Sequence, residues 1–369
     1  MKILFVSNIS WSLYNFRRGF MMALRQRGHE VIFCANADEY TGRLEGLGFR
    51  FIPVEVDRKG TSFNKDLRLF KDLYSIYAKE KPTLIFHNSI KPNIYGALAA
   101  KFAGIRCVNT VSGLGYIFMR KGLHYYLVKF LYWMACMFAE KTFFQNRDDL
   151  KLFLEKRIVS LSKTALVKGS GVNTDLFNPN YCAAVKKVKN TFIFSFIGRI
   201  LWDKGVGEFI EASRIIKQQY PSVKINLLGM IDKGNPAAVT KAQIEAWERE
   251  GLVEYRGETD DVRPFMCESD CVVLPSYREG TPKALLEASA MEKPIITTDA
   301  VGCREVVEDQ VSGFLVPVRD PVKLQEAMKR IIELPLEKRM SMGRMGREKV
   351  LREFSEQIVI ETYCRELKL

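Results

Sequence analysis

The feature that most constrains this chain is a regular alternation of short apolar runs with amphipathic segments of helical period. Ile3–Ser7 (ILFVS), Val31–Ala35 and Thr83–His87 (TLIFH) have the length of buried strands, whereas Asn15–Arg27 and Phe63–Lys81 repeat apolar residues as helices do. Strands that alternate with helices pair in parallel, because each helix returns the chain to the same end of the sheet. The order predicts an α/β fold with a doubly wound parallel sheet.

The alternation pauses once, between Gly169 and Asn190, and restarts at Thr191–Ile197 (TFIFSFI). The pause holds Gly, Asn and Pro and then the basic run VKKVKN, a composition that indicates a linker. A chain of 369 residues is long enough for two domains on either side of it. We predict a first domain over residues 1–172, a linker over 173–190, a second domain over 191–352, and a C-terminal helix over 353–369 that packs back on the first domain. Ligands are expected beyond the carboxyl ends of the strands, in a cleft between the domains.

The positive charge of the chain is concentrated in its first half. The net charge is +13, and residues 1–180 carry all of this excess, because Lys and Arg equal Asp and Glu over residues 181–369. No acidic residue occurs from Lys81 to Ala139. Such asymmetry indicates an anionic partner for the first half. Nucleic acid, an anionic membrane surface or a phosphorylated lipid would each fit, and ordinary solubilising charge is the alternative.

The cysteines and histidines do not form the spacing of a metal site. Eight cysteines are scattered along the chain, Cys267 and Cys271 are the only close pair, and there are three histidines. Zinc sites require paired cysteines or a clustered Cys/His set, so we predict no metal and expect reduced thiols in a cytosolic protein. The N-terminal MKILFVSNISW has too short an apolar run for a signal peptide and is expected to be a buried strand.

A loop rich in glycine and cations follows the first strand of the second domain. That strand ends at Ile197, Gly198 allows a sharp turn, and Arg199 and Lys204 precede a helix that begins near Gly207. A guanidinium grips phosphate oxygens as a fork, a lysine supplies a point charge, and a helix N-terminus favours an anion. The loop favours diphosphate binding, although solvated loop cations give the same pattern.

A second loop, within Leu274–Ala290 (LPSYREGTPKALLEASA), carries two glutamates. Glu279 lies in the loop and Glu287 follows eight positions later, in a helix that begins at Pro282. A loop carboxylate can accept hydrogen bonds from sugar hydroxyls, and a carboxylate in the helix can reach a ribose diol. The N–H groups at the start of the helix suit an anion. A surface loop before a packed helix is the alternative.

These segments resemble the retaining glycosyltransferases of family 4, whose GT-B fold consists of two Rossmann-like domains. EGTPKALLE matches the E-x7-E motif of that family, and Gly198, Arg199, Lys204 and Gly205 match its phosphate segment. HNSIKPNIYGALAA, TVSGLGYIF and GSGVNTDLF are similar to the branch that acts on undecaprenyl-diphosphate-linked sugars. The resemblance implies retaining transfer of a sugar, an N-acetylhexosamine, from a UDP-sugar to a polyprenyl-diphosphate-linked saccharide in cell-surface polysaccharide assembly.

The resemblance also implies roles in the donor site. Arg199 and Lys204 are expected to hold the donor diphosphate and stabilise the leaving group, and Glu279 is expected to contact the transferred sugar; these are the candidate catalytic residues. Glu287 is expected to bind the ribose, and Arg256 lies in the segment expected beside the base. The other donor-binding candidates shape the pocket: Gly198, Gly205, Gly280, Thr281, Pro282, Lys283, Ala284 and Leu285. Fixed cations replace a metal in this scheme, so neither a metal nor a cofactor is predicted.

The first domain is expected to receive the acceptor beside an anionic membrane. The acceptor and membrane candidates are Asn15, Arg17, Arg18, His87, Lys91, Ser112, Arg120 and Lys121. Many family members have a histidine at the position of Ser112, so a histidine contact is not expected there. His87 ends a strand, where a histidine often serves the structure instead.

Basic and aromatic residues surround the apolar segment Leu123–Ala139, a composition typical of a membrane interface. The segment is short for a membrane span and contains His124 and Lys129. We expect peripheral attachment to the cytoplasmic face of the inner membrane, with a true span and a buried core helix as the alternatives.

Two other classes of function share some of these features. A nucleotide-sugar epimerase has the same two-domain fold but acts on the free nucleotide sugar. A nucleic-acid-binding protein would account for the charge, but the chain has no helix-turn-helix, zinc-finger or RNP signature. We therefore predict no nucleic-acid partner.

Overall fold

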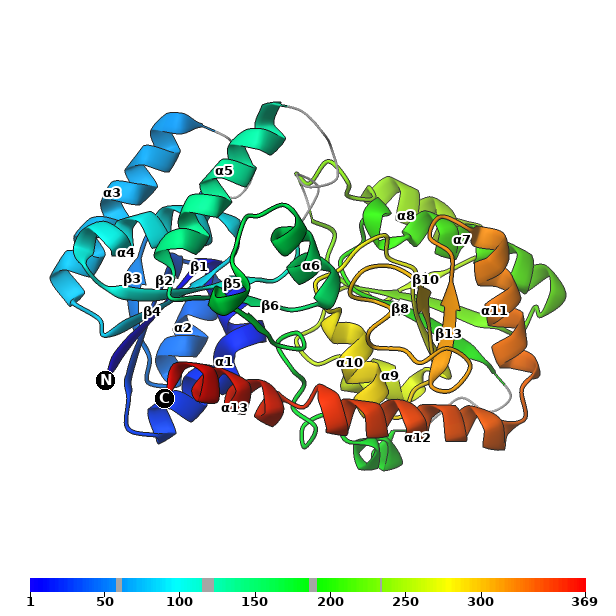
Figure 1. Ribbon diagram of the computed structural model, residues 1–369. Coiled ribbons are helices and arrows are strands. Elements are labelled where there is room, and N and C mark those ends of the chain that lie inside the picture. The colour runs from blue at the N-terminus through cyan, green and yellow to red at the C-terminus, as the bar shows by residue number, and fades with distance from the viewer. Residues whose placement is uncertain (58–61, 115–122, 186–190, 233) are drawn as a thin grey trace. The chain divides into compact units, whose positions relative to one another are not determined.

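The structure is a computed structural model that describes residues 1–57, 62–114, 123–185, 191–232 and 234–369, without the side chains of residues 123 and 124 (Figure 1). The described chain divides into two compact units. Met1–Ser170 and Glu356–Leu369 form the first unit, and Gly171–Ser355 forms the second. Each unit contains a parallel sheet with helices on its faces, which confirms the predicted α/β class of two doubly wound domains.

The first unit is built on a sheet of seven described strands in the order β3-β2-β1-β4-β5-β6-β7. The strands are β1 (Lys2–Ile9), β2 (Glu30–Asn36), β3 (Arg50–Pro53), β4 (Leu84–Asn88), β5 (Arg106–Val111), β6 (Lys141–Phe144) and β7 (Thr164–Leu166). The helices are α1 (Ser10–Gln26), α2 (Glu39–Gly46), α3 (Phe63–Glu80), the π-helix η1 (Pro92–Gly96), α4 (Ala97–Ala103), α5 (Leu123–Phe138), α6 (Arg147–Glu155), the 3-10 turn η3 (Leu161–Lys163) and α13 (Glu356–Leu367). The strand order reverses between β1 and β4, which makes this the switch point of the sheet.

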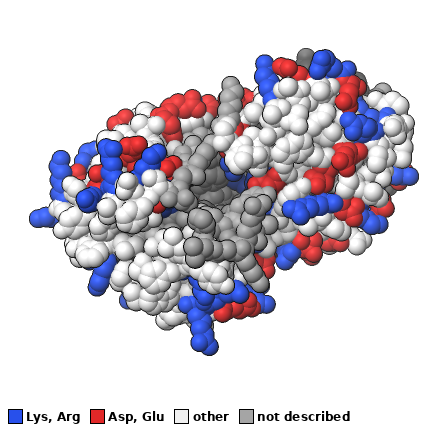
Figure 2. Space-filling view, turned by 90° about the horizontal axis from the view of Figure 1, so that it is seen from above, with Lys and Arg blue, Asp and Glu red and all other residues white. Residues whose placement is uncertain are grey.

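Helix α5 divides its surface between the core and the outside of the first unit. Tyr132, Ala135 and Cys136 are buried in the core, whereas an outward row is exposed. We call this row the α5 stripe: Tyr126, Leu127, Phe130, Trp133 and Met137. Figure 2 views the molecule from the side on which α3 and α5 lie in Figure 1, and shows wide uncharged areas there. None of the described helices is long and apolar enough to cross a membrane.

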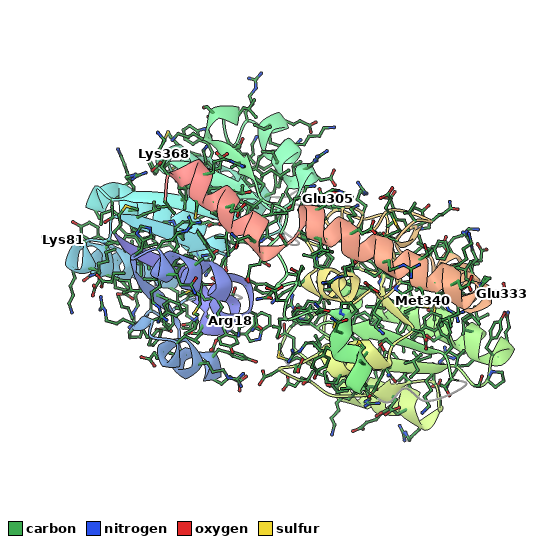
Figure 3. The ribbon with its side chains drawn as sticks, turned by 90° about the horizontal axis from the view of Figure 1, so that it is seen from below. Arg18, Lys81, Glu305, Glu333, Met340 and Lys368 are labelled. Carbon is green, nitrogen blue, oxygen red and sulfur yellow. A yellow bond between two sulfur atoms is a disulfide. The ribbon has the colours of Figure 1, made fainter. Side chains whose placement is uncertain are left out.

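The last helix of the chain, α13, packs on the first unit although it follows the second in sequence. Tyr363 is buried, and its ring stacks on Phe20 of α1 with 4.8 Å between the ring centroids. Figure 3 shows α13, which ends beside Lys368, along the same face as α1 with its Arg18. Phe5 and Phe86, stacked at 4.8 Å, form the sheet side of this core.

On the other face of the sheet, His87 is part of a buried hydrogen-bond network. Its Nε2 lies 2.9 Å from the Tyr77 hydroxyl, and its Nδ1 lies 3.0 Å from Asn109 Oδ1. Because the amide oxygen can only accept, Nδ1 carries the proton and Nε2 accepts from the tyrosine. His87 is fully buried with both ring nitrogens bonded, so its ring is a core group. The expectation that it contacts an acceptor is corrected on this ground.

The second unit repeats the architecture with a sheet of six described strands in the order β10-β9-β8-β11-β12-β13. The strands are β8 (Ile193–Ile197), β9 (Lys224–Leu228), β10 (Glu254–Tyr255), β11 (Cys271–Leu274), β12 (Ile295–Thr298) and β13 (Gly313–Val316). The helices are the 3-10 helices η4 (Pro179–Ala184) and η5 (Trp202–Lys204), and α7 (Val206–Gln219), α8 (Lys241–Arg249), α9 (Arg263–Glu268), α10 (Lys283–Ala290), α11 (Pro321–Glu333) and α12 (Leu336–Glu353). Here the switch point lies between β8 and β11.

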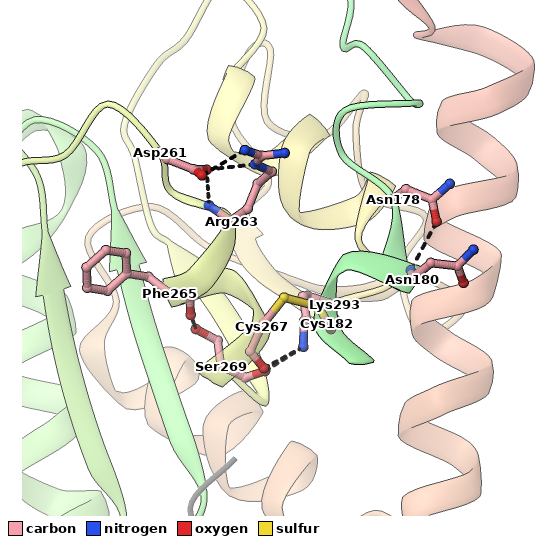
Figure 4. Close-up of a disulfide and its surroundings, with 9 residues drawn as sticks. All are labelled: Asn178, Asn180, Cys182, Asp261, Arg263, Phe265, Cys267, Ser269 and Lys293. Atoms are coloured by element: carbon pink, nitrogen blue, oxygen red, sulfur yellow. Dashed lines mark hydrogen bonds and ion pairs between the residues drawn. A yellow bond between two sulfur atoms is a disulfide. The ribbon is translucent and has the colours of Figure 1, made fainter. Parts of the chain in front are cut away.

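A disulfide joins Cys182 of η4 to Cys267 of α9 (Figure 4). The expectation that all thiols are reduced is therefore wrong for this pair, because the fold brings two cysteines 85 positions apart to a Cα separation of 5.1 Å. The bridge, together with the buried Phe177, ties residues 173–185 to the second unit. The composition of residues 173–190 predicts a linker, but residues 173–185 belong to the second unit. The other six cysteines all lie in the described segments and are free and buried.

The buried His87 network predicts a pH-dependent stability. Burial lowers the pKa of His87 from 6.5 to about 4, so between these values the unfolded chain binds more protons than the folded chain. The free energy of unfolding therefore falls as the pH falls from 6.5 to 4, by roughly 3 kcal/mol at about 1.4 kcal/mol per unit. In His87→Gln, which cannot titrate, this loss should shrink, as measured by urea unfolding at pH 4.5, 5.5, 6.5 and 7.5.

His29→Gln is the matched control, because His29 lies near the surface and contacts the N-terminal amine at 3.2 Å. It should keep most of the wild-type dependence on pH. Equal slopes for His87→Gln and the wild type would contradict the assignment of a neutral, buried His87.

Candidate functional site

The two loops that the sequence singled out meet at the switch point of the second sheet. One loop follows β8 and the other follows β11, and these strands are neighbours. Gly205 makes the close approach possible, because a Cβ added there would lie 2.0 Å from the main-chain oxygen of Pro275, and its φ is +76°. The Tyr277 N–H donates to the main-chain oxygen of Asp203 at 3.0 Å and joins the loops further.

An ion pair between Lys204 and Glu279 links the two predicted motifs directly. Lys204 Nζ donates to Glu279 Oε1. The side chains are only 16% and 12% exposed, so both charges are largely removed from water. Desolvation offsets much of the attraction between two such charges, so the surrounding fold must hold them in place. The structure thus places a cation and a carboxylate from positions 75 residues apart in one site.

The Glu279 loop is held in turn by the chain that follows β12. The Glu279 N–H donates to the main-chain oxygen of Val301 at 2.9 Å. Gly302 lies so close that an added Cβ would be 2.5 Å from the main-chain oxygens of both Glu279 and Gly280. Gly302 was not singled out from the sequence, where a lone glycine after a strand carries little signal.

Arg199 has a different partner from Lys204. Its Nη1 lies 3.1 Å from Asp232 Oδ2, and its side chain is 43% exposed. Asp232 comes from the loop after β9 and was not predicted. Gly198 turns the chain toward Arg199. Gly229 packs so closely against Gly198 that a Cβ added to Gly229 would lie 1.8 Å from the main-chain oxygen of Gly198. Each of the two predicted phosphate-binding cations therefore already has a carboxylate partner.

Glu287 is a buried carboxyl in the middle of α10. It lies 3.5 Å from Lys283, one turn earlier in the helix. Burial raises the pKa of Glu287 above its ordinary value of 4.5, and Lys283 opposes that rise. Because ionisation is disfavoured in the folded chain, Glu287 makes the fold less stable as the pH rises above about 4.5. A carboxyl retained at such a cost is typical of a functional site.

Thr281 and Pro282 connect the Glu279 loop to α10, and Lys283 and Ala284 are the first two residues of that helix. Leu285 differs from them, because its side chain is fully buried in the core and its N–H donates to the main-chain oxygen of Pro282 at 3.1 Å. The expectation that Leu285 binds the donor is therefore corrected.

Arg256 follows β10 and is held by two carboxylates. It lies 3.0 Å from Glu254 and 3.6 Å from Glu268, and its guanidinium lies over the Phe265 ring at 5.1 Å. The structure thus places Arg256 at the carboxyl edge of the sheet. Its contacts among the described residues include neither Lys204 nor Glu279. Among the described residues, no three His, Cys, Asp or Glu side chains cluster as metal ligands would.

The acceptor and membrane candidates in the first unit are dispersed. Lys91 is paired with Asp66 at 2.6 Å, and Arg18 lies over the Tyr14 ring at 4.7 Å. Asn15 donates to the main-chain oxygen of Trp11, Ser112 is exposed in the loop after β5, and residues 120 and 121 lie outside the described segments. Arg17 is only 5% exposed, which corrects the expectation that it belongs to an interfacial surface.

Both halves of the chain match known protein families. Residues 2–146 match the family described as Glycosyl transferase 4-like. Residues 179–349 match the family described as Glycosyl transferases group 1. The second match contains the Arg199, Lys204, Glu279 and Glu287 positions.

Curated relatives extend over nearly the whole chain. The chain is 29% identical to the N,N'-diacetylbacillosaminyl-diphospho-undecaprenol alpha-1,3-N-acetylgalactosaminyltransferase of Campylobacter jejuni, over 99% of this chain and 98% of that protein. It is 27% identical to the capsular polysaccharide biosynthesis glycosyltransferase CapM of Staphylococcus aureus, over 80% and 81%. It is 26% identical to the UDP-Gal:alpha-D-GlcNAc-diphosphoundecaprenol alpha-1,3-galactosyltransferase of Escherichia coli, over 77% and 74%.

Among solved structures, the Anabaena protein HepE in complex with UDP and glucose shares the fold, with a TM-score of 0.84 at 20% identity over 100% of this chain and 99% of that one. A sucrose-phosphate synthase of Thermosynechococcus elongatus gives a TM-score of 0.83 at 19% identity, over 100% and 98%. The two parallel-sheet units, the loops joined at the second switch point and these matches lead to one conclusion: the chain is a glycosyltransferase of the GT-B class, with a Glycosyl transferase 4-like first half and a Glycosyl transferases group 1 second half.

Proposed function

We propose that this glycosyltransferase transfers an N-acetylhexosamine from a UDP-sugar to a saccharide linked to polyprenyl diphosphate, with retention of the anomeric configuration. The observation that carries the proposal is the Lys204–Glu279 pair at the second switch point, where a cation for phosphate and a carboxylate for sugar hydroxyls lie together. The names of the relatives from Campylobacter jejuni and Escherichia coli, which both specify a saccharide linked to diphosphoundecaprenol, support this class of acceptor. The polysaccharide role of CapM supports a place in cell-surface polysaccharide assembly.

The proposed reaction requires the site to stabilise a leaving nucleoside diphosphate. As the bond to the sugar breaks, negative charge builds on the β-phosphate, and Lys204 and Arg199 are the groups to bind it. Glu279 and Asp232 hold these cations beforehand, so that little reorganisation is needed when phosphate oxygens arrive. Glu279 then accepts hydrogen bonds from the sugar, and Glu287 accepts them from the ribose. Fixed cations supply the charge stabilisation in this scheme, without a metal or cofactor.

The acceptor is presented at a membrane, and the α5 stripe supports peripheral attachment of the first unit. Phe130 and Trp133 stack with 5.9 Å between their ring centroids, and both are about half exposed. Exposed aromatic side chains on a helix whose other face packs on a core suit the interfacial region of a bilayer. The excess positive charge of the first half adds attraction to anionic lipids. We infer attachment to the cytoplasmic face of the inner membrane.

The proposed reaction requires both substrates. We expect purified enzyme to transfer sugar from UDP-GlcNAc or UDP-GalNAc to a synthetic polyprenyl-diphosphate saccharide, with product linkage and anomeric configuration assigned by NMR. Without acceptor, the donor sugar should stay unchanged. Conversion of the free UDP-sugar into its epimer would contradict transfer and support an epimerase.

The two candidate cations should each be required for the rate. Lys204→Ala and Arg199→Ala are expected to lower kcat by about two to three orders of magnitude, because each removes a charge that stabilises the leaving diphosphate. The measurement is the initial rate of transfer at saturating donor and acceptor. Lys241→Ala is the matched control, because it also removes a lysine from an ion pair, with Glu245 at 3.2 Å, but on an exposed helix. Near-normal turnover in both site variants would contradict the assignment.

Membrane attachment should depend on the α5 stripe. Phe130→Ser combined with Trp133→Ser is expected to lower the partition coefficient onto vesicles containing anionic lipid by about tenfold or more, because two large apolar side chains no longer insert. Flotation of vesicles with bound protein measures this. Leu336→Ser combined with Met340→Ser is the control, because it removes two exposed apolar residues from α12. High salt or carbonate should release the wild type, and a requirement for detergent would contradict peripheral attachment.

A further inference from the structure

The first sheet has its own switch point, between β1 and β4. On the face of these two strands that packs beneath α1, the side chains are apolar along the strands and polar at their carboxyl ends. Ile3 and Phe5 of β1 and Phe86 of β4 face the core beneath α1 and α13. Ser7 and Asn88 continue these rows by the two-residue repeat of a strand, and both are buried. Ligands of doubly wound sheets bind at such a point, beyond the carboxyl ends of the strands.

Arg17 of α1 reaches this group of polar side chains. Its Nε donates to Asn88 Oδ1 at 2.8 Å, and its guanidinium lies 5.6 Å from the centroid of the Tyr363 ring. It is the one Lys or Arg that is buried in the described part of the chain. A guanidinium has five N–H donors, and within the described segments only the one on Nε has a hydrogen-bond partner.

The charge of Arg17 has no carboxylate partner among the described residues. Burying an unpaired charge is costly, and the better-solvated cations Lys91, Lys204 and Arg199 are each paired with an acid. No Asp or Glu occurs between Lys81 and Ala139, the segment that contains β4 and β5. The arrangement therefore requires an anion that the described part of the chain does not supply.

One unpartnered polar atom lies on the same face of the sheet. Ser7 Oγ is buried and has no hydrogen-bond partner in the described structure. Buried polar atoms are nearly always hydrogen bonded, so each exception requires an explanation. A hydroxyl that can donate to an oxyanion, on the same face of the sheet as an unneutralised guanidinium, suits a bound phosphate oxygen.

We propose that Arg17, positioned by Asn88 and aided by the Ser7 hydroxyl, binds a phosphate of the diphosphate that joins the acceptor saccharide to its lipid. Asn88 fixes the guanidinium through Nε, which leaves the terminal nitrogens for the phosphate. The proposal rests on the proposed function and deepens it, because Arg199 and Lys204 of the second unit serve the donor diphosphate. The shared chemistry is a diphosphate, so the test separates the acceptor from the donor.

The deciding experiment compares Arg17→Gln with Arg25→Gln in the full-length enzyme. Arg25 is an exposed control on the same helix. It also donates one hydrogen bond, to the main-chain oxygen of Leu47, and lies 5.5 Å from the centroid of an aromatic ring, Phe49. Arg17→Gln should raise the KM for the lipid-linked acceptor about tenfold or more, with the KM for the donor within about twofold of the wild type. Arg25→Gln should leave both KM values unchanged.

Ser7→Ala gives a second test that does not depend on Arg17. The Ser7 hydroxyl has no hydrogen-bond partner among the described residues, so its removal should leave the melting temperature unchanged or higher. The KM for the acceptor should rise severalfold all the same. The KM of Arg17→Lys for the acceptor should lie between those of the wild type and Arg17→Gln, because lysine keeps the charge but lacks the forked pair of guanidinium donors. Together these variants decide the question even if Arg17→Gln does not fold.

Calorimetry separates failure of this inference from failure of the proposed function. The wild type should bind farnesyl diphosphate more tightly than farnesyl monophosphate, and farnesol most weakly, and Ser7→Ala and Arg17→Lys should flatten this series. If no saccharide is transferred but the series holds, the anion site stands without the proposed reaction. If transfer occurs but the variants match Arg25→Gln, or if only the KM for the donor rises, the inference is overturned.

Discussion

Lys204 and Glu279 form the contact on which the candidate site of the second unit depends. Neither loop could hold its charged side chain away from water alone, because a largely buried charge needs a fixed partner. The partner is fixed because β8 and β11 are adjacent strands, and because Gly205 lets the main chains of their loops touch. Replacement of one loop would therefore disturb the other, although 75 residues separate the two charges.

The two units share an architecture but treat positive charge in opposite ways. At the second switch point, Lys204 and Arg199 each lie against a carboxylate, so the site is nearly neutral before a substrate diphosphate binds. At the first switch point, Arg17 is more deeply buried than either, and its hydrogen bond and ring contact in the described structure are with the neutral Asn88 and Tyr363. A preset pair suits phosphate groups that must arrive and leave in each cycle. An unpaired buried guanidinium suits an anion that completes the structure when it binds.

Helix α5 and the segment before β8 show how one stretch of sequence can serve two environments. The apolar character of α5 is divided by its rotation into a core face at Tyr132 and Cys136 and an outward stripe at Phe130 and Trp133. The sequence predicted an interfacial helix, with a core helix as an alternative, and the structure buries one face of α5 and leaves the opposite face exposed. Residues 173–185 look like a linker by composition, yet Phe177 and the Cys182–Cys267 bridge hold them on the second unit.

The sequence by itself determined the α/β class, the doubling of the sheet, and the loops that carry Arg199, Lys204, Glu279 and Glu287, because strand and helix periods and glycine positions are local properties. Only the tertiary structure decided which side chains meet. It paired Lys204 with Glu279 and Arg199 with Asp232, turned Leu285 into the core, enclosed His87 between Tyr77 and Asn109, and buried Arg17 beneath α13. Burial and pairing depend on contacts between residues far apart in the chain, and a linear pattern carries no measure of those distances.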